Sequence, residues 1–200
     1  MLKIFHAQGS RSLRVLWLCE EMGVPYETAE ASFKPSESFI AANPLRTIPV
    51  MTDGAVTMIE SVAMMTYIMA KHGPTDLEVK PDEPGYADYL QYLLFGEAGL
   101  TAYGNPLVAT RFMAPDGAKE NWTTGYIRST ILKRLEFVCE RLGDKPYIAA
   151  NRFTAADISI AYISIAAKFV GIENDIPARL RSYCDALAQR PAFQPAAAIA

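Results

Sequence analysis

Residues 46–61 combine groups that suit the binding of a small, acidic, peptide-like ligand. Pro49 opens a short apolar stretch where it cannot donate to a sheet, and a cis bond after Ile48 would explain its place there. Such a bond would leave the backbone of Ile48 facing outward, free to pair with an extended peptide. Glu60 and Ser61 follow at the predicted start of a helix, whose N–H groups attract a carboxylate. The spacing therefore predicts a receptor for an extended, charged ligand.

A second polar cluster, residues 8–12, lies between a predicted strand and a predicted helix. Its plainest explanation is that Ser10 or Ser12 caps the helix, since serine is favoured there. The same geometry also suits a thiol, because a hydroxyl can donate to a thiolate while the helix dipole lowers the pKa of that thiol. This role needs no adjacent base, so the missing His/Asp partner argues only against a hydrolytic triad. Both interpretations stay open at this point.

Predicted strands and helices alternate over residues 1–76 and must position these residues. Their order predicts a small α/β layer with mixed strand directions. The predicted strands are residues 2–7, 26–29, 49–51 and 56–58. The predicted helices are one around residues 15–22, ended by Gly23 and Pro25, a short helix or irregular connection at 35–42, and one at 60–72.

Proline-rich residues 77–84 predict a linker, and residues 85–200 predict an all-helical domain. A long pattern over residues 86–113 is interrupted by glycines and by Pro106, which should kink the helix. Another apolar stripe covers residues 127–142. Thr154 and Asp157 match a capping box, and the helix behind them is apolar nearly all round to Phe169, which predicts the buried centre of this domain. Pro177 begins a further helix.

Composition narrows the class of protein. The net charge of −3 and the lack of a Lys/Arg cluster give no support to nucleic-acid binding. No signal-peptide pattern opens the chain and no apolar run is long enough to span a bilayer, so we expect a cytoplasmic protein that does not bind membranes. The three cysteines predict reduced thiols, and the two histidines, His6 and His72, predict structural or exposed positions. No metal site is expected, because no ligand spacing is present.

Taken in order, these motifs resemble the soluble glutathione transferases, and the resemblance covers essentially the whole chain. Its marks are Ser10-x-x-x-Arg14, Asn43-Pro44 leading into Arg-Thr-Ile-Pro, Glu60-Ser61, and the segment 153–158 around the capping box. The resemblance implies an α/β plus all-α fold: a thioredoxin-like domain of order β-α-β-α-β-β-α at residues 1–76, then the linker 77–84, then the helical domain 85–200. It also implies a homodimer.

The resemblance further implies roles for individual residues. Ser10 resembles the serine of theta- and delta-like members that hydrogen-bonds the sulfur of glutathione, with Ser12 as the alternative if the loop register differs. Ile48, before Pro49, would pair its backbone with the cysteinyl part. Glu60 would meet the ammonium of the γ-glutamyl end.

In the same way, Ser61 would hold the γ-glutamyl carboxylate, and Arg46 lies where relatives often place a basic group facing the glycyl carboxylate. Tyr103, Pro106 and Arg111 are candidates for the electrophile pocket of the helical domain. Ala150 departs from the glycine that many relatives have before the capping segment, which affects a local turn.

The predicted function is a bacterial-type glutathione transferase that ionises glutathione and conjugates it to a small hydrophobic electrophile, as in detoxification, with glutathione as co-substrate and no other cofactor. The loop near Ser10 contains no cysteine or tyrosine, which argues against omega-, beta- and tyrosine-type chemistry, and no Ser-Ser-Cys, which disfavours zeta-like isomerisation. Two alternatives remain. One is glutathione-dependent peroxide or disulfide reduction, or dehalogenation, on the same scaffold. The other is a glutathione-binding interaction module with little turnover.

Overall fold

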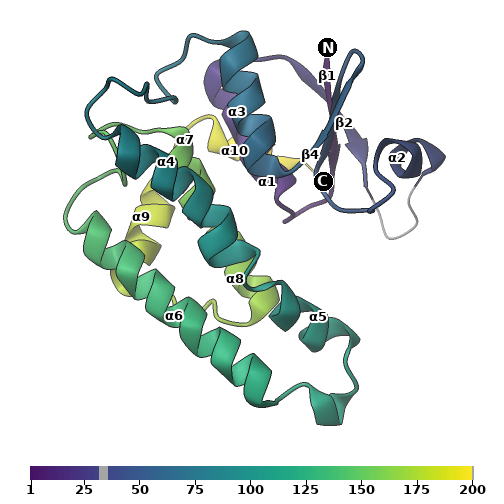
Figure 1. The fold of residues 1–200 in the computed structure, drawn as a ribbon, viewed down its shortest axis with the longest axis vertical. Helices are drawn as coiled ribbons and strands as arrows, with labels where there is room; N and C mark the ends of the chain where they lie inside the picture. The colour runs from purple at the N-terminus through teal and green to yellow at the C-terminus, as the bar shows by residue number, and fades with distance from the viewer. Residues whose placement is uncertain (32–35, 200) are drawn as a thin grey trace. The chain divides into compact units, whose positions relative to one another are not determined.

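The computed structural model describes residues 1–31 and 36–199, which form two compact units (Figure 1). The first unit contains Met1–Glu78 together with Ala188–Ala200, and the second contains Val79–Leu187. The sequence prediction assigned everything from residue 85 to the helical domain, whereas the structure groups the C-terminal segment with the first unit.

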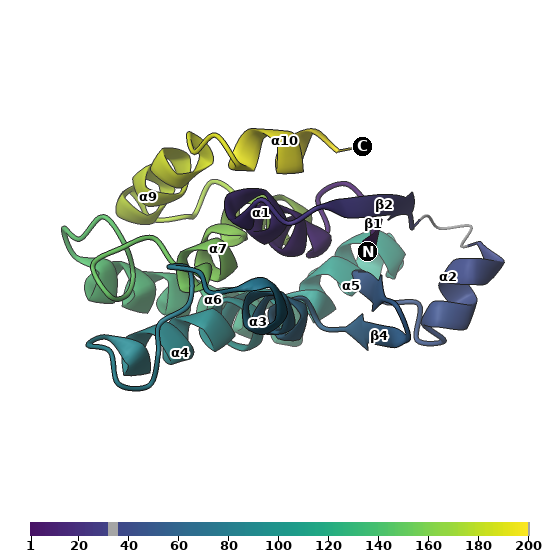
Figure 2. The same cartoon turned by 90° about the horizontal axis from the view of Figure 1, so that it is seen from above.

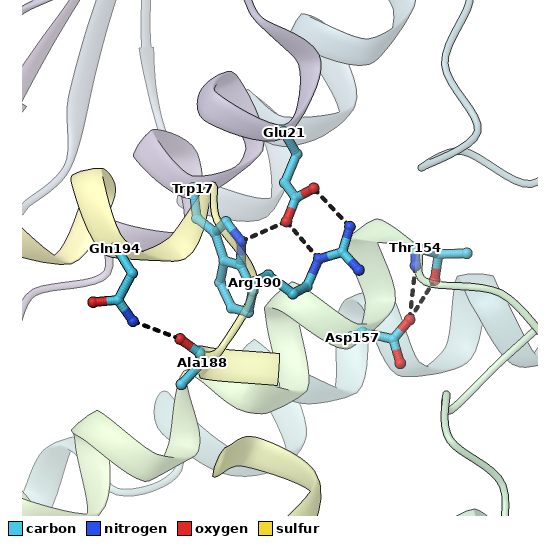
Figure 3. Close-up of polar contacts among 7 residues, drawn as sticks. All are labelled: Trp17, Glu21, Thr154, Asp157, Ala188, Arg190 and Gln194. Carbon is cyan, nitrogen blue, oxygen red and sulfur yellow. Dashed lines mark hydrogen bonds and ion pairs between the residues drawn. The ribbon is translucent and has the colours of Figure 1, made fainter. Parts of the chain in front are cut away.

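Long-range contacts explain this difference. The C-terminal helix α10 (Phe193–Ala198) packs on α1 (Ser12–Met22) of the first unit, where Phe193 meets the ring of Trp17 edge-on at a centroid distance of 4.8 Å. Arg190 donates to both carboxylate oxygens of Glu21 at 2.6 and 2.8 Å (Figure 3). Such contacts join residues far apart in the chain, so local periodicity does not reveal them.

The first unit is built on a four-stranded mixed sheet of order β2-β1-β3-β4. Its strands are β1 (Leu2–His6), β2 (Tyr26–Glu30), β3 (Val50–Asp53) and β4 (Val56–Ile59). β1 runs parallel to β2, with α1 as the crossover, and antiparallel to β3, which pairs antiparallel with β4. Gly54, at φ +61°, provides the turn between β3 and β4.

Helices cover both faces of this sheet. α1 packs against α3 (Ser61–His72), and α2 (Glu37–Ala42) lies on the opposite side of the sheet (Figures 1 and 2). Phe39 of α2 meets Phe5 of β1 edge-on at 5.5 Å, in a core cluster with Val50. Because successive strand residues point to opposite faces, buried Ile4 faces the other layer.

The thioredoxin-like fold and its order of elements are thus confirmed, and of the two alternatives for residues 35–42 the structure shows the short helix. Pro35 itself lies outside the described residues.

The second unit is helical, as predicted. Its helices are α4 (Tyr86–Phe95), the π-helical segment η1 (Gly96–Thr101), α5 (Asn105–Met113), the short 3₁₀ segment η2 (Asp116–Ala118), α6 (Trp122–Leu142), α7 (Ala155–Ala161) and α8 (Ile163–Val170), and α9 (Ala178–Ala188) ends it. The predicted interruption of residues 86–113 is confirmed, since η1 separates α4 from α5. Gly96 is required there because a Cβ would stand 2.3 Å from the hydroxyl of Ser159 in α7.

The capping box at the start of α7 is confirmed, with Asp157 accepting the backbone N–H of Thr154 at 2.8 Å (Figure 3). All of α7 is buried. The single apolar helix expected to follow is instead two, since the helical pattern is interrupted at Tyr162. Phe169 in α8 is 39% exposed and does not belong to the buried centre.

Ala150, which stands where the family resemblance leads one to expect glycine, lies in the turn before α7. Ala150 adopts φ +52°, a region that disfavours residues with a Cβ, and packs beside Gly85. We expect Ala150→Gly to raise the free energy of unfolding by about 1 kcal/mol, because the left-handed strain disappears. The matched control is Ala149→Gly, at a buried position without positive φ, which should lower it. Chemical denaturation checks both, and a destabilised Ala150→Gly variant would contradict the strain argument.

Candidate functional site

Strand pairing brings the predicted binding segments to one end of the sheet. Phe5 of β1 pairs with Val50 of β3, so the next residue, His6, lies level with Pro49. Val50 also pairs with Ile59, which places Glu60 level with Pro49 on the other side. The N-termini of α1 and α3 begin at this same end. Three segments therefore converge at this end: the serine loop (residues 7–11), the proline loop (residues 43–49) and the Glu60-Ser61 pair.

The loop between β1 and α1 presents Ser10 rather than Ser12. Gly9, at φ +74°, turns the chain, and the N–H of Ser10 donates to the carbonyl of Ala7 at 3.0 Å. Ser12 is the first residue of α1 and is fully buried, whereas Ser10 is partly exposed. A molecule approaching from solvent meets the hydroxyl of Ser10 first.

Behind these serines lies His6, which the sequence interpretation regarded as structural or exposed. It is 3% exposed, and its Nδ1 lies 2.7 Å from the hydroxyl of Ser12, which in turn lies 2.6 Å from the hydroxyl of Ser10. Its Nε2 lies 3.1 Å from the carbonyl oxygen of Ile199. Burial lowers the pKa of His6, against a smaller opposite effect of the Ile199 hydrogen bond. The one sequence signal for this contact was the position of His6 directly before the serine loop.

The proline loop is held by Asn43. The predicted cis peptide bond between Ile48 and Pro49 is confirmed. Asn43, only 2% exposed, donates to the carbonyl of Thr47 at 2.8 Å and accepts the N–H of Leu45 at 3.0 Å. These bonds fix the chain that leads to the cis bond, so Asn43 has a positioning role within the motif.

Arg46, in the same loop, is exposed and adopts φ +55°, while Ile48 is half-buried. The side chain of Arg46 is therefore open to solvent, in the loop that leads to Ile48, and is not part of the core.

Glu60 and Ser61 connect β4 to α3. Glu60 is exposed and holds φ +73° and ψ +103°, a sparsely populated conformation for a residue with a side chain. Such outliers persist where the surrounding structure imposes them, and they cluster at binding sites. Ser61, 2% exposed, is the first residue of α3.

Arg14, which the sequence analysis noted only within the Ser-x-x-x-Arg mark, contacts the start of α3. It is fully buried in α1, and its Nη1 donates to the hydroxyl of Ser61 at 3.3 Å. This contact places a guanidinium behind the N-terminus of α3 and adds positive charge where an anion would bind. The Ser-x-x-x-Arg spacing was the signal that could have indicated it.

The three candidates for the electrophile pocket lie in the second unit. Arg111 lines a cavity of about 410 Å³ with Arg128 and Val170, and it donates to the carbonyl of Lys168 at 3.0 Å. Tyr103 and Pro106 are not among the residues that line it. The guanidinium of Arg134 covers the ring of Tyr103 at 4.0 Å.

Metal ligands and reactive cysteines do not mark this site. Within residues 1–31 and 36–199, no three His, Cys, Asp or Glu side chains gather as a metal would require. The cysteines are free thiols, and burial raises the pKa of Cys19 and Cys184 to about 12 each, so both stay protonated at neutral pH. Over the same described residues, no helix has the length and apolar character to cross a bilayer.

The fold consists of a thioredoxin-like domain followed by a helical domain, and the predicted binding segments converge at one end of the sheet. Residues 10–71 match the family described as "Glutathione S-transferase, N-terminal domain". Glutathione S-transferase 3 of Schizosaccharomyces pombe is 27% identical, over 98% of this chain and 87% of its own. The match to this family therefore covers residues 10–71, within the first unit of the chain.

Solved structures show the same fold. A glutathione transferase from Pseudomonas putida, with one glutathione disulfide bound per subunit, superposes with a TM-score of 0.84 at 20% identity, over 99% of this chain and 91% of that one. Ure2p5 from Phanerochaete chrysosporium, cocrystallized with 1-(S-glutathionyl)-2,4-dinitrobenzene, gives 0.79 at 23% identity, over 98% and 92%. At these identities the likeness concerns the fold.

Proposed function

We propose that this protein is a serine-type glutathione transferase that holds glutathione at the end of β1, β3 and β4, with its sulfur at Ser10. The observation that carries the proposal is the convergence there of the serine loop, the cis-proline loop and the start of α3. A tripeptide with a thiol at its centre and charges at both ends matches these three segments in order.

Each end of the ligand has a partner of suitable chemistry. The carboxylate of Glu60 binds the γ-glutamyl ammonium, while Ser61 and the start of α3, backed by Arg14, bind the γ-glutamyl carboxylate. The backbone of Ile48 pairs with the cysteinyl residue, and the exposed guanidinium of Arg46 binds the glycyl carboxylate.

Catalysis follows from thiolate stabilisation and proximity. The hydroxyl of Ser10 and the N-terminus of α1 stabilise negative charge on the sulfur. The thiolate attacks the electrophilic carbon, a sulfur–carbon bond forms, and the leaving group departs with the bonding electrons. We further propose a cytoplasmic homodimer of bacterial type whose helical domain binds a small hydrophobic electrophile.

Calorimetric titration with glutathione, followed by assays of aryl halide conjugation and organic peroxide reduction, tests the function. We expect binding and conjugation. Binding with neither activity would favour the interaction-module alternative, and peroxide reduction that exceeds conjugation would favour the reductase. An absence of binding would overturn the proposed site.

The strained backbone of Glu60 gives a prediction that separates binding from stability. Glu60→Ala and Glu60→Gly both remove the carboxylate, so both should weaken glutathione binding about ten- to a hundredfold, as expected for a charge-assisted hydrogen bond. Only glycine adopts φ +73° without strain, so Glu60→Gly should be more stable than Glu60→Ala by about 1 kcal/mol.

Titration calorimetry measures the affinities and chemical denaturation measures the stabilities. Unchanged affinity in both variants would contradict the ammonium contact. If Glu60→Ala proves as stable as Glu60→Gly, the positive φ at residue 60 does not lower the stability of the protein, and the strain argument is wrong.

A further inference from the structure

We propose that His6 is the final proton acceptor of a relay, in which the proton of the glutathione thiol passes through the hydroxyls of Ser10 and Ser12 to Nδ1 of His6. This inference rests on the proposed binding of glutathione with its sulfur at Ser10. It assigns a function to a buried histidine that the family motifs do not include.

The three groups form a continuous chain from the surface inward. The hydroxyl oxygens of Ser10 and Ser12 are 2.6 Å apart, and the hydroxyl of Ser12 is 2.7 Å from Nδ1 of His6. Both distances lie at the short end for hydrogen bonds of these types. Ser12 is fully buried and His6 is 3% exposed, while Ser10 is partly exposed, so solvent and ligand reach the chain at Ser10.

The carbonyl of Ile199 fixes the tautomer of His6. A carbonyl oxygen only accepts hydrogen bonds, so Nε2, at 3.1 Å from it, must carry a proton. Burial lowers the pKa of His6, which keeps the imidazole neutral before ligand binds. In the neutral ring Nδ1 then has a free lone pair and accepts from the hydroxyl of Ser12.

This tautomer sets the direction of every bond in the chain. Ser12 donates to His6, so the bond between the two serines must be donated by Ser10, and Ser10 turns a lone pair toward the ligand. Before ligand ionises, this series of hydrogen bonds is therefore arranged so that Ser10 accepts the S–H proton of a thiol. In that arrangement Ser10 cannot donate a hydrogen bond to a thiolate.

Proton transfer along the chain resolves this conflict. The S–H bond breaks as its proton moves to Ser10, the proton of Ser10 moves to Ser12, and that of Ser12 forms an Nδ1–H bond on His6. The products are a thiolate and an imidazolium, with each hydroxyl restored. Every link still carries one proton, and its direction is now reversed, so Ser10 donates to the thiolate. Suppose instead that the proton left for solvent while His6 stayed neutral. Ser10 would then still donate to Ser12, and a lone pair of its oxygen would face a lone pair of the thiolate with no proton between them.

The charges also balance. An imidazolium buried alone would be costly, but the negative thiolate forms in the same step, and opposite charges nearby favour both ionised forms. The ring of the imidazolium donates from both nitrogens, to Ser12 and to the carbonyl of Ile199. The C-terminal segment thus contributes to the site through one backbone oxygen.

NMR of ring-nitrogen-labelled histidine reads this step directly, because the chain contains only two histidines and His72 is exposed on α3. In the His72→Gln protein we expect glutathione to convert His6 from one protonated nitrogen to two. S-methylglutathione, which has no thiol proton, should leave His6 neutral. Neutral His6 in the presence of bound glutathione, with thiolate absorption in the ultraviolet, would overturn the relay, whereas a lack of glutathione binding would overturn the proposed function instead.

Variants separate proton acceptance from hydrogen bonding. His6→Asn can still accept from Ser12 at the former Nδ1 position but cannot hold the proton, and Ser12→Ala cuts the chain without touching His6. We expect each to lower kcat about a hundredfold, as for loss of a general base, with KM for glutathione nearly unchanged. Ser12→Thr, which keeps the hydroxyl, should restore most of the rate. A His6→Asn protein that folds and keeps its wild-type kcat would also overturn the relay.

Discussion

We expect Ser10→Ala to lower kcat/KM for the conjugation of an aryl halide by about 10²- to 10³-fold, while glutathione still binds. A single hydroxyl that donates to a developing anion typically contributes this much. Ser10 is the partly exposed member of the serine pair, so it is the one that a bound sulfur can touch. Steady-state kinetics with both substrates varied measures the effect, and the ultraviolet absorption of the thiolate shows whether the bound thiol remains protonated.

The control is Ser182→Ala, which removes an exposed serine on α9 and should leave the kinetics unchanged. Ser12→Ala distinguishes the two serines, since in the proposed site the hydroxyl of Ser12 reaches the sulfur only through Ser10. If Ser12→Ala proved more damaging than Ser10→Ala, the sulfur would contact Ser12 and the loop would have to open. Full activity in both variants would contradict thiolate stabilisation by this loop.

Signals that lie close together in the sequence predicted the structure well. The cap at Thr154 and Asp157 depends on residues within one helical turn, and the proline loop depends on residues close to Pro49 in the sequence. Both could therefore be predicted from the sequence. The interruption at Tyr162 was not predicted, because residues 158–169 contain no glycine or proline that would mark the end of a helix.

The contacts of His6 and Arg14 that the sequence did not predict join distant segments. His6 contacts Ile199, which is 193 residues further along the chain, and Arg14 of α1 contacts Ser61 at the start of α3. Glu60 and Ser61 could be proposed as binding residues from the sequence because their types suit a peptide ligand. The sequence pattern does not reveal which residue a buried histidine or a buried arginine will contact, so these two contacts became visible only in the fold.

Asp157→Ala has the largest expected effect on stability. Its Oδ1 accepts the N–H of Ile148 at 2.8 Å and the hydroxyl of Tyr183 at 2.6 Å, while Oδ2 accepts the N–H and hydroxyl of Thr154 at 2.8 and 3.1 Å. The carboxyl is fully buried and joins the loop before α7, the cap of α7 and α9. Burial raises the pKa of Asp157 and the four donated bonds oppose that effect.

Truncation would leave these buried donors without an acceptor, at about 1–3 kcal/mol each, partly offset by relaxation. We therefore expect a loss of about 4 kcal/mol, which is exceptional for one substitution and a large part of the stability of an ordinary domain. Chemical denaturation followed by far-ultraviolet circular dichroism measures it.

Tyr183→Phe is the graded comparison, because it removes one donor and leaves the carboxylate with its three others. Its expected loss is about 1 kcal/mol, so the two variants should differ severalfold in their effect on the unfolding free energy. Glutathione affinity of the folded fraction should stay unchanged in both, since the proposed binding residues belong to the first unit and Asp157 to the second. Equal losses in the two variants would show that Tyr183 is the only donor that matters, and that the capping bonds at Thr154 are replaced by water at little cost.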